Sequence, residues 1–464
     1  MTAPPRGWGQ LRVARQSKKP EAKGEGRSLR TAQKRDRDRI LYSSALQRLA
    51  YVTQVTAPEA GHSFHNRLGH SLKVAQVGRR NVERLRELAS RREITGKGAK
   101  AVLAVDPDAV EAACLAHDLG HPPFGHIAEE RLHECVKVHV EDGFEGNAQS
   151  FRIVTRLAVR NHRQGLDLTR ETLDYLLKYP WKHWPKAPRK GDKRTEKWGY
   201  YQDDRDAFGF ARELWPAETK GELPEKSLGA EIMDWADDLT YEVHDVDDFF
   251  RAGLIPLERL RSPIDPELKR LATQLESLKD ADAARFPDYE IPHLVETVRE
   301  ILSRDGPIEP YSHTQSARAD LREFGSELIT RYLEAFRVYE TKGEDDAQLE
   351  IDADAEREVA ALKLLVRVYV IHRPTLAVVQ HGQQRVIGEL FECYFKDSAP
   401  ESSQRLLPPG ARERLADADG SGGARARVVA DLIAGLTETA AVEIHERLCG
   451  RGSGSALDAT ALIG

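Results

Sequence analysis

The sequence predicts a protein built mainly from α-helices. Aromatic residues make up only 7% of its 464 residues, whereas Leu, Ala and Arg, which favour helices, are plentiful. Apolar residues recur at helical spacing over several stretches, among them residues 30–49, 228–245 and 360–376. The chain contains no run of 18 apolar residues, so we expect no transmembrane helix. A chain of this length can form two or three domain-sized units, or one large unit with insertions.

Composition and charge narrow the class of protein. Hydrophobic residues account for 40% and charged residues for 31%, which fits a soluble globular protein, and the net charge of −6 argues against a nucleic-acid coat protein. The four cysteines lie far apart without C-x-x-C spacing, as expected of reduced thiols. The N-terminus lacks the apolar segment of a signal peptide. We therefore expect a cytoplasmic protein.

The first part of the chain differs from the rest by an excess of basic residues. We expect residues 1–28 to form a disordered basic tail, with contact to nucleic acid or polyphosphate as the minority alternative. A helical pattern begins near Arg30, and its arginines fit either a solvated face or contacts with a polyanion. Gln54 follows this helix, shortly before a predicted turn at residues 58–61.

A second helix is predicted from about residue 67, with His70 near its start. A lone histidine at such a position is usually a core or cap residue. Arg67 lies three residues earlier on the same helix face, so a cation and a potential metal ligand are presented together. Arginine is the side chain best suited to bidentate binding of phosphate.

The densest group of functional side chains lies between residues 114 and 126. An apolar run leads into the adjacent pair His117 and Asp118, and Gly120 then ends the helix. One divalent ion can take a ligand from each residue of the pair and still keep open positions for water and substrate. An isolated His-Asp pair is more often a buried histidine beside a capping aspartate. The metal interpretation is favoured here by other potential ligands in the chain, namely His70, His121, His126, Glu129 and Asp237.

Three further features complete the pattern. Glu129 follows His126 by one helical turn, the spacing of an orienting pair for proton transfer.

Residues 180–226 are rich in Pro, Trp and Lys, and we expect an inserted exposed loop, either a solvated excursion or a lid or subunit-contact element. In the helix predicted after this loop, one face carries two carboxylates and a phenol without Lys or Arg partners, so one carboxylate is free to complete a metal site. The residues of this face are Asp237, Tyr241 and Asp245.

Taken together, these motifs resemble the deoxyguanosine-triphosphate triphosphohydrolase family of the HD-domain superfamily. The likeness is strong over residues 29–178 and 227–250 and weak beyond residue 256, where only a helical pattern continues. The segments that carry it are Arg30-Thr, Arg35-Asp-Arg-Asp-Arg39-Ile, Gln47-Arg48-Leu, Thr53-Gln54-Val, Arg67-Leu-Gly-His70-Ser-Leu, His117-Asp118-Leu-Gly-His121-Pro-Pro-Phe-Gly-His126, Phe144-Glu145-Gly-Asn147-Ala-Gln149 and Ala236-Asp237-Asp238.

The resemblance implies an all-α fold with an HD-domain helical core over residues 29–255, including the 180–226 insertion, and a helical C-terminal region over residues 256–464. It implies hydrolysis of a deoxynucleoside triphosphate, dGTP or another, to deoxynucleoside and tripolyphosphate, and hence control of dNTP pools. The implied cofactor is a divalent metal ion: Mg, Mn or another transition metal. Relatives form oligomers, often hexamers, and some bind single-stranded DNA or respond to a second nucleotide. A homo-oligomer, a nucleotide effector and single-stranded DNA are therefore the partners to test, and no membrane is implied.

Position by position, the resemblance also implies roles for individual residues. The metal ligands would be His70, His117, Asp118 and Asp237. His126 and Glu129 would form the catalytic pair, with His121, at whose position some relatives carry asparagine, beside the phosphates. The residues implied to contact substrate are Gln54 at the sugar 3′-hydroxyl, Arg67 at the α-phosphate, and Tyr241 under the sugar with Asp245 nearby.

Two alternatives to this function stay open. One is a different HD hydrolase, acting on nucleoside monophosphates or guanosine polyphosphates, which would release orthophosphate or pyrophosphate instead of tripolyphosphate. The other is a regulator that binds nucleotide or single-stranded DNA with little turnover, which the basic tail and the insertion motivate. A pure binder has no need of His126 and Glu129, and this favours the enzyme.

Overall fold

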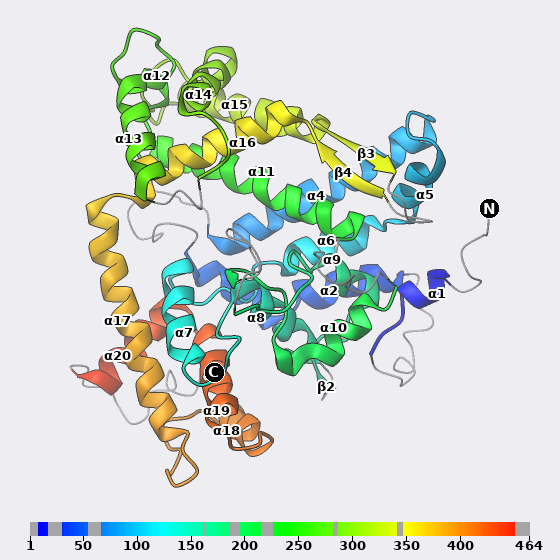
Figure 1. Ribbon diagram of the computed structural model, residues 1–464, viewed down its shortest axis with the longest axis vertical. Helices are drawn as coiled ribbons and strands as arrows, with labels where there is room; N and C mark the ends of the chain where they lie inside the picture. The colour runs from blue at the N-terminus through cyan, green and yellow to red at the C-terminus, as the bar shows by residue number, and fades with distance from the viewer. Residues whose placement is uncertain are drawn as a thin grey trace.

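The computed structural model describes residues 8–16, 30–53, 66–160, 163–185, 195–214, 226–281, 286–340 and 347–450. Helices dominate these residues, and the predicted all-α class is confirmed (Figure 1). The strands found among them form two small antiparallel sheets, β1 (Val159–Arg160) with β2 (Arg163–Gln164) and β3 (Phe336–Glu340) with β4 (Ala347–Ile351). None of the described helices combines the length and the apolarity needed to cross a membrane.

The N-terminal half is organised around a short buried helix, α6 (Pro107–Ala116). Asp106 caps this helix by accepting hydrogen bonds from backbone N–H groups of its first turn, and Pro107 suits that first turn because it has no N–H to satisfy. Most residues of α6 are small and fully buried, so other helices can pack closely around it. These helices are α2 (Ala32–Leu41), α4 (Arg67–Ser90), α9 (Arg170–Tyr175) and α11 (Leu228–Arg251).

Helix α4 approaches α6 closely because it carries a glycine at their contact. A Cβ atom on Gly78 would lie only 2.6 Å from the Sγ atom of Cys114 on α6. Helix α11 packs against both α4 and α6. The start of α4, the end of α6 and the middle of α11 therefore meet on one side of this core, where the candidate site lies. The other α-helices described in this half are α1 (Trp8–Arg12), α3 (Ser44–Arg48), α5 (Gly96–Ala104), α7 (His126–Lys137), α8 (Gly146–Arg152) and α10 (Arg205–Arg212).

The C-terminal region divides into two groups of helices with different packing partners. Helices α12 to α16 extend the hydrophobic core that contains α11, whereas α17 to α20 form a second core with α7. Figure 1 shows the two groups at opposite ends of the molecule. The bounds are α12 (Leu257–Leu260), α13 (Glu267–Ala281), α14 (Ile291–Asp305), α15 (Gln315–Glu334), α16 (Ala353–Val366), α17 (Pro374–Asp397), α18 (Pro409–Ala416), α19 (Gly422–Ala434) and α20 (Glu438–Cys449).

Part of the expected disordered tail is ordered. Helix α1 forms within it, the Arg12 guanidinium donates a hydrogen bond to the Tyr175 hydroxyl (2.8 Å), and Arg15 pairs with the buried carboxylate of Asp36 (2.6 Å). The expectation of disorder over the whole of residues 1–28 is therefore wrong for residues 8–16. Composition revealed the basic charge of the tail but not the buried acid that it meets. Residues 1–7 and 17–29 lie outside the described residues.

The expectation of an exposed loop over residues 180–226 is also wrong for much of that segment. It contains α10, and Trp181, Trp198 and Tyr201 are buried in a cluster with Ala148 of α8. Prolines and lysines hide this cluster in the sequence because they interrupt any periodic apolar pattern. Residues 186–194 and 215–225 lie outside the described residues.

Candidate active site

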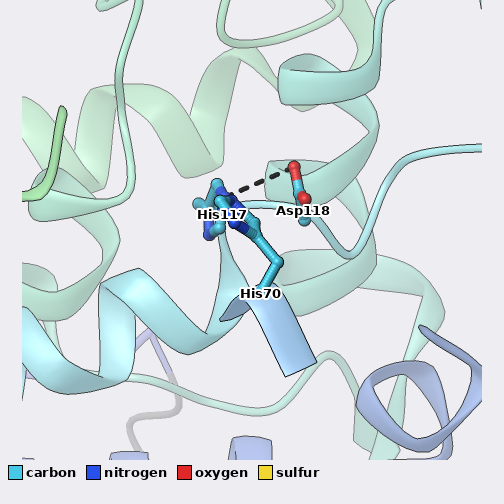
Figure 2. Close-up of side chains that lie close together, drawn as sticks. All are labelled: His70, His117 and Asp118. Atoms are coloured by element: carbon cyan, nitrogen blue, oxygen red, sulfur yellow. Dashed lines mark ion pairs between the residues drawn. The ribbon is translucent and has the colours of Figure 1, made fainter. Parts of the chain in front are cut away.

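Three helices bring two histidines and two aspartates together. His70 lies in the first turn of α4, His117 and Asp118 follow α6, and Asp237 lies within α11. The Nε2 atom of His70 lies 3.0 Å from Oδ1 of Asp237. The Nε2 atom of His117 lies 3.3 Å from the same oxygen and 3.4 Å from Oδ1 of Asp118. Figure 2 shows His70, His117 and Asp118 pointing toward one another.

The residues of this cluster fit a divalent metal ion. The Nδ1 atom of His117 lies 2.6 Å from the backbone oxygen of Cys114, and since a carbonyl only accepts, Nδ1 carries a proton. The Nε2 atom of His117 is buried, yet it makes no hydrogen bond with any described residue. Ligand atoms of His70, His117 and Asp118 all lie within 4.8 Å of one another. Imidazoles and carboxylates that converge in this way are a typical ligand set for divalent transition metals.

Lys178 holds the second oxygen of Asp237. Its Nζ atom lies 2.9 Å from Oδ2 of Asp237 and 2.7 Å from Oδ1 of Asp234. Burial alone would raise the pKa of Asp237, but Lys178 and His117 outweigh burial and hold this pKa well below its usual range. The expectation that this face of α11 lacks a Lys or Arg partner is therefore wrong. The partner comes from a segment 59 residues earlier, beyond the reach of helical spacing rules.

A second cluster forms at the start of α7. The Nδ1 atom of His126 lies 3.0 Å from Oε2 of Glu129, and the His126 side chain is 60% exposed whereas that of Glu129 is buried. The other oxygen of Glu129 accepts hydrogen bonds from Lys197 Nζ (3.0 Å) and from the backbone N–H of Gly146 (3.1 Å). Burial raises the pKa of Glu129, but Lys197 and His126 together hold it well below its usual range. The pair therefore joins an ionised, buried carboxylate to an exposed imidazole.

His121 lies between the two clusters. Its Nδ1 atom is 3.1 Å from Oδ1 of Asp118, its Nε2 atom is 3.9 Å from Oε2 of Glu129, and its ring meets that of His126 edge-on. Burial and the nearby Arg67 lower the pKa of His121 to about 4. This histidine is therefore neutral near pH 7 and links the clusters without adding positive charge.

Arg67 is buried against the first cluster. Its Nη1 atom donates to Oδ2 of Asp118 (2.9 Å) and its Nε atom donates to the backbone oxygen of Thr53 (3.1 Å). Its Nη2 atom has no hydrogen-bond partner in the described part of the chain. One donor of this guanidinium is thus available for a ligand. Gln54, which follows Thr53, lies outside the described residues.

Tyr241 and Asp245 continue the site along α11. The ring of Tyr241 packs edge-on against His70, with ring centroids 5.9 Å apart. Asp245 is buried, and its Oδ2 atom has no hydrogen-bond partner among the residues that the structure describes. Burial raises the pKa of this carboxyl, and the neighbouring Asp248 adds to the rise. A buried carboxyl oxygen without a partner is costly to keep unless a ligand satisfies it.

The loop that links α6 to α7, residues 117–125, is called the active-site loop and is held from two sides. On one side, Arg48 of α3 donates hydrogen bonds to the backbone oxygens of Leu119 (2.9 Å), His121 (2.7 Å) and Leu436 (3.0 Å). On the other side, α8 packs so closely that a Cβ atom on Gly120 would lie 2.2 Å from the backbone oxygen of Gly146. Glycine is therefore required at position 120 for α8 to reach the loop.

The C-terminal region also contacts this loop. Glu438, the first residue of α20, accepts hydrogen bonds from the backbone N–H (2.7 Å) and hydroxyl (2.7 Å) of Thr53 and from the backbone N–H of Phe124 (3.1 Å). Sequence reasoning missed the supporting roles of Arg48, Lys178, Lys197 and Glu438. Arg48 belongs to one of the motifs, but its contacts do not follow from it, and none of the other three residues is part of a motif.

Comparison with known proteins agrees with this arrangement. Residues 67–242, which include both clusters, match the HD domain, and residues 349–447 match the phosphohydrolase-associated domain. A deoxyguanosinetriphosphate triphosphohydrolase-like protein of Streptomyces coelicolor is 38% identical over 97% of this chain and 99% of its own. The chain belongs to this family. Members named in the same way from Corynebacterium efficiens (36% identity, 89% of each chain) and Shewanella baltica (29%, 92% of this chain and 94% of its own) are also similar. The resemblance noted from the motifs is confirmed, and this member of the triphosphohydrolase-like family is a hydrolase of the HD class.

We expect Arg48→Ala to destabilise the protein, because the carbonyls of Leu119, His121 and Leu436 lose a partly buried donor. A buried polar group left unsatisfied costs about 1–3 kcal/mol. Thermal denaturation should therefore show a clearly lower midpoint for this variant. The control Arg91→Ala removes only an exposed ion pair with Glu87 and should leave the midpoint nearly unchanged. Equal midpoints for the two variants would contradict the role given to Arg48.

Proposed function

We propose that this protein hydrolyses deoxynucleoside triphosphates, dGTP or others, to deoxynucleoside and tripolyphosphate. The observation that carries the proposal is the placement of a buried His/Asp cluster next to a His-Glu pair, with His121 reaching Asp118 of the first and Glu129 of the second. The HD match and the printed name of the relatives, deoxyguanosinetriphosphate triphosphohydrolase-like, support a nucleoside triphosphate as substrate.

His70, His117, Asp118 and Asp237 are the proposed ligands of a divalent ion, with Mg, Mn and other transition metals as candidates. When bound, such an ion supplies polarisation of phosphoryl oxygens and lowers the pKa of a water ligand. Arg67 and Lys178 each bind one oxygen of the aspartates and leave the other oxygen facing the histidines. This second layer of contacts fixes the ligand geometry before an ion arrives.

His126 and Glu129 are the proposed catalytic pair. Because Glu129 accepts from Nδ1–H, the exposed imidazole, when both of its nitrogens are protonated, can give the Nε2 proton to the departing 5′-oxygen. Lys197 and the Gly146 N–H keep Glu129 ionised, so it orients the imidazole without competing for its proton. His121, proposed to lie beside the phosphates, stays neutral in this scheme.

The remaining proposed contacts are with substrate. The free Nη2 donor of Arg67 suits an oxygen of the α-phosphate, and Tyr241 would lie under the sugar. The unpaired Oδ2 atom of Asp245 offers an acceptor to a nucleoside hydroxyl. Gln54 is proposed to contact the 3′-hydroxyl of the sugar, as the family resemblance implies. The cytoplasmic location, the homo-oligomer, the nucleotide effector and the binding of single-stranded DNA stay predictions from the sequence.

The reaction is tested by incubating the purified protein with each dNTP, singly and mixed, with Mg or Mn, and separating the products by anion exchange. We expect tripolyphosphate and free deoxynucleoside. Orthophosphate or pyrophosphate would instead indicate a different HD hydrolase. Unchanged substrate under every condition would contradict the enzymatic proposal and favour a binding or regulatory protein.

We expect His126→Ala to lose most turnover while keeping the metal, because His126 belongs to the proton-transfer pair and not to the ligand cluster. General acid–base catalysis contributes about 10²–10⁴-fold, so turnover should fall by that factor. Metal content per chain should match the unaltered protein. His381→Ala, at an exposed position on α17, is the control and should retain both properties. Near-normal turnover of the His126 variant would remove this residue from the mechanism.

Metal binding should release protons and strengthen with pH. Burial alone would lower the pKa of His117, but Asp118 and Asp237 outweigh it and raise this pKa to about 9 in the metal-free protein. A metal needs the Nε2 lone pair, so below pH 9 it must displace a proton, and apparent affinity should rise about tenfold per pH unit. Calorimetric titration in buffers of different ionisation enthalpy measures the protons released. A heat that is independent of the buffer at pH 7 would contradict this assignment of His117.

A further inference from the structure

Four side chains with metal-binding atoms converge between α17 and α20, outside the candidate active site. Glu389 and Cys393 lie on α17, and His445 and Cys449 lie on α20. In each helix the two residues are four positions apart, so both face the same side. The two helices pack against each other near the lower left of Figure 1. Each helix therefore presents two potential ligands to the other.

Three of these four side chains have ligand atoms close enough to share an ion, and the fourth, Cys393, contacts the thiol of one of the three. The Nε2 atom of His445 lies 2.7 Å from Oε2 of Glu389, and ligand atoms of Glu389, His445 and Cys449 all lie within 4.8 Å of one another. The Sγ atoms of Cys393 and Cys449 lie 3.8 Å apart. Two thiolates bound to one zinc ion at about 2.3 Å in tetrahedral geometry are separated by roughly the same distance.

The surroundings orient the carboxylate and admit an ion. The Nε atom of Arg385 donates to Oε1 of Glu389 (2.6 Å), so Oε2 is left to face His445. A hydrogen bond of this kind, to the atom that does not bind metal, is typical of the outer layer of metal sites. Cys393 is half-buried and Cys449 is exposed, so an ion can reach the sulfur atoms from solvent.

We propose that Glu389, Cys393, His445 and Cys449 form a second, structural metal site for a thiophilic divalent cation of the zinc class. Two thiolates, an imidazole and a carboxylate make a softer ligand set than the two histidines and two aspartates of the candidate active site. The two sites therefore select different metals. The cysteine spacing on which sequence analysis relies, C-x-x-C, does not reveal a site whose ligands are paired four residues apart on two helices.

The second site has a structural consequence for the first. An ion there ties the end of α20 to α17, and the start of the same helix carries Glu438, which binds Phe124 in the active-site loop and Thr53 beside it. Helix α17 packs on α7, which carries His126 and Glu129. The proposed ion thus joins α20, which supports the loop through Glu438, to α17, which packs on the helix that carries His126 and Glu129.

The site is tested by adding Co²⁺ to the metal-free, reduced full-length protein and recording the near-ultraviolet charge-transfer band between sulfur and cobalt. The candidate active site has only nitrogen and oxygen ligands, so this band reports the thiolate site alone. We expect a band that saturates at about one thiolate-bound ion per chain and that Zn²⁺ abolishes. Cys393→Ser and Cys449→Ser should each lose most of it, whereas Cys135→Ser, on α7, should keep it.

A second readout covers the case in which a serine variant folds poorly. His445→Gln retains both thiols and should bind Co²⁺ at least about tenfold more weakly. Zn²⁺ should raise the thermal midpoint of the unaltered protein by more than that of His445→Gln. The proposal is overturned if the reduced protein shows no band, or if the band survives in the Cys393→Ser/Cys449→Ser double variant. It is equally overturned if the two cysteines are recovered as a disulfide from protein that takes up no thiolate-bound metal when reduced.

Discussion

The carboxylates of Asp118, Asp237 and Glu129, at the centre of the candidate site, are each held by a cation at one oxygen and face a histidine with the other. Arg67 holds Asp118, Lys178 holds Asp237 and Lys197 holds Glu129. A buried charge is costly unless it is paired, and removing one partner of a buried pair is strongly destabilising. These three cations therefore stabilise the folded protein in spite of the many acids and imidazoles that it brings together at the site. They also determine which oxygen of each acid is left to face a ligand.

The three cations come from different parts of the chain, so the site depends on tertiary packing throughout. Arg67 begins α4, Lys178 follows α9, and Lys197 belongs to the aromatic segment that packs on α8. The loop between the clusters has its own supports in Arg48 and Glu438. Residues outside the metal-binding and catalytic sets thus carry much of the geometry, and a change in them would alter the site without touching a ligand.

The parts of the site that sequence reasoning could predict are those set by local spacing. His126 and Glu129 share a helical turn, and the placement of Asp237, Tyr241 and Asp245 on one helix follows from the period of that helix. The motif set then identified the family. The cation partners could not be predicted, because Lys178 and Lys197 meet their acids only when distant segments fold together. The same reason explains the errors over residues 8–16 and 180–226. Their average composition predicts disorder and exposure, but the structure pairs Arg15 with Asp36 and buries Trp181 and Trp198.

The hydrogen bonds between Thr53 and Glu438 join residues 385 positions apart in the chain. Synthesis proceeds at about 5–20 residues per second, so roughly 20–80 seconds separate the emergence of the two partners. All the motif residues of the candidate site are synthesised within the first 245 positions, yet Glu438, which also accepts a hydrogen bond from Phe124 in the active-site loop, arrives only with α20. The order of synthesis therefore makes completion of the active-site loop one of the final steps in the formation of the protein.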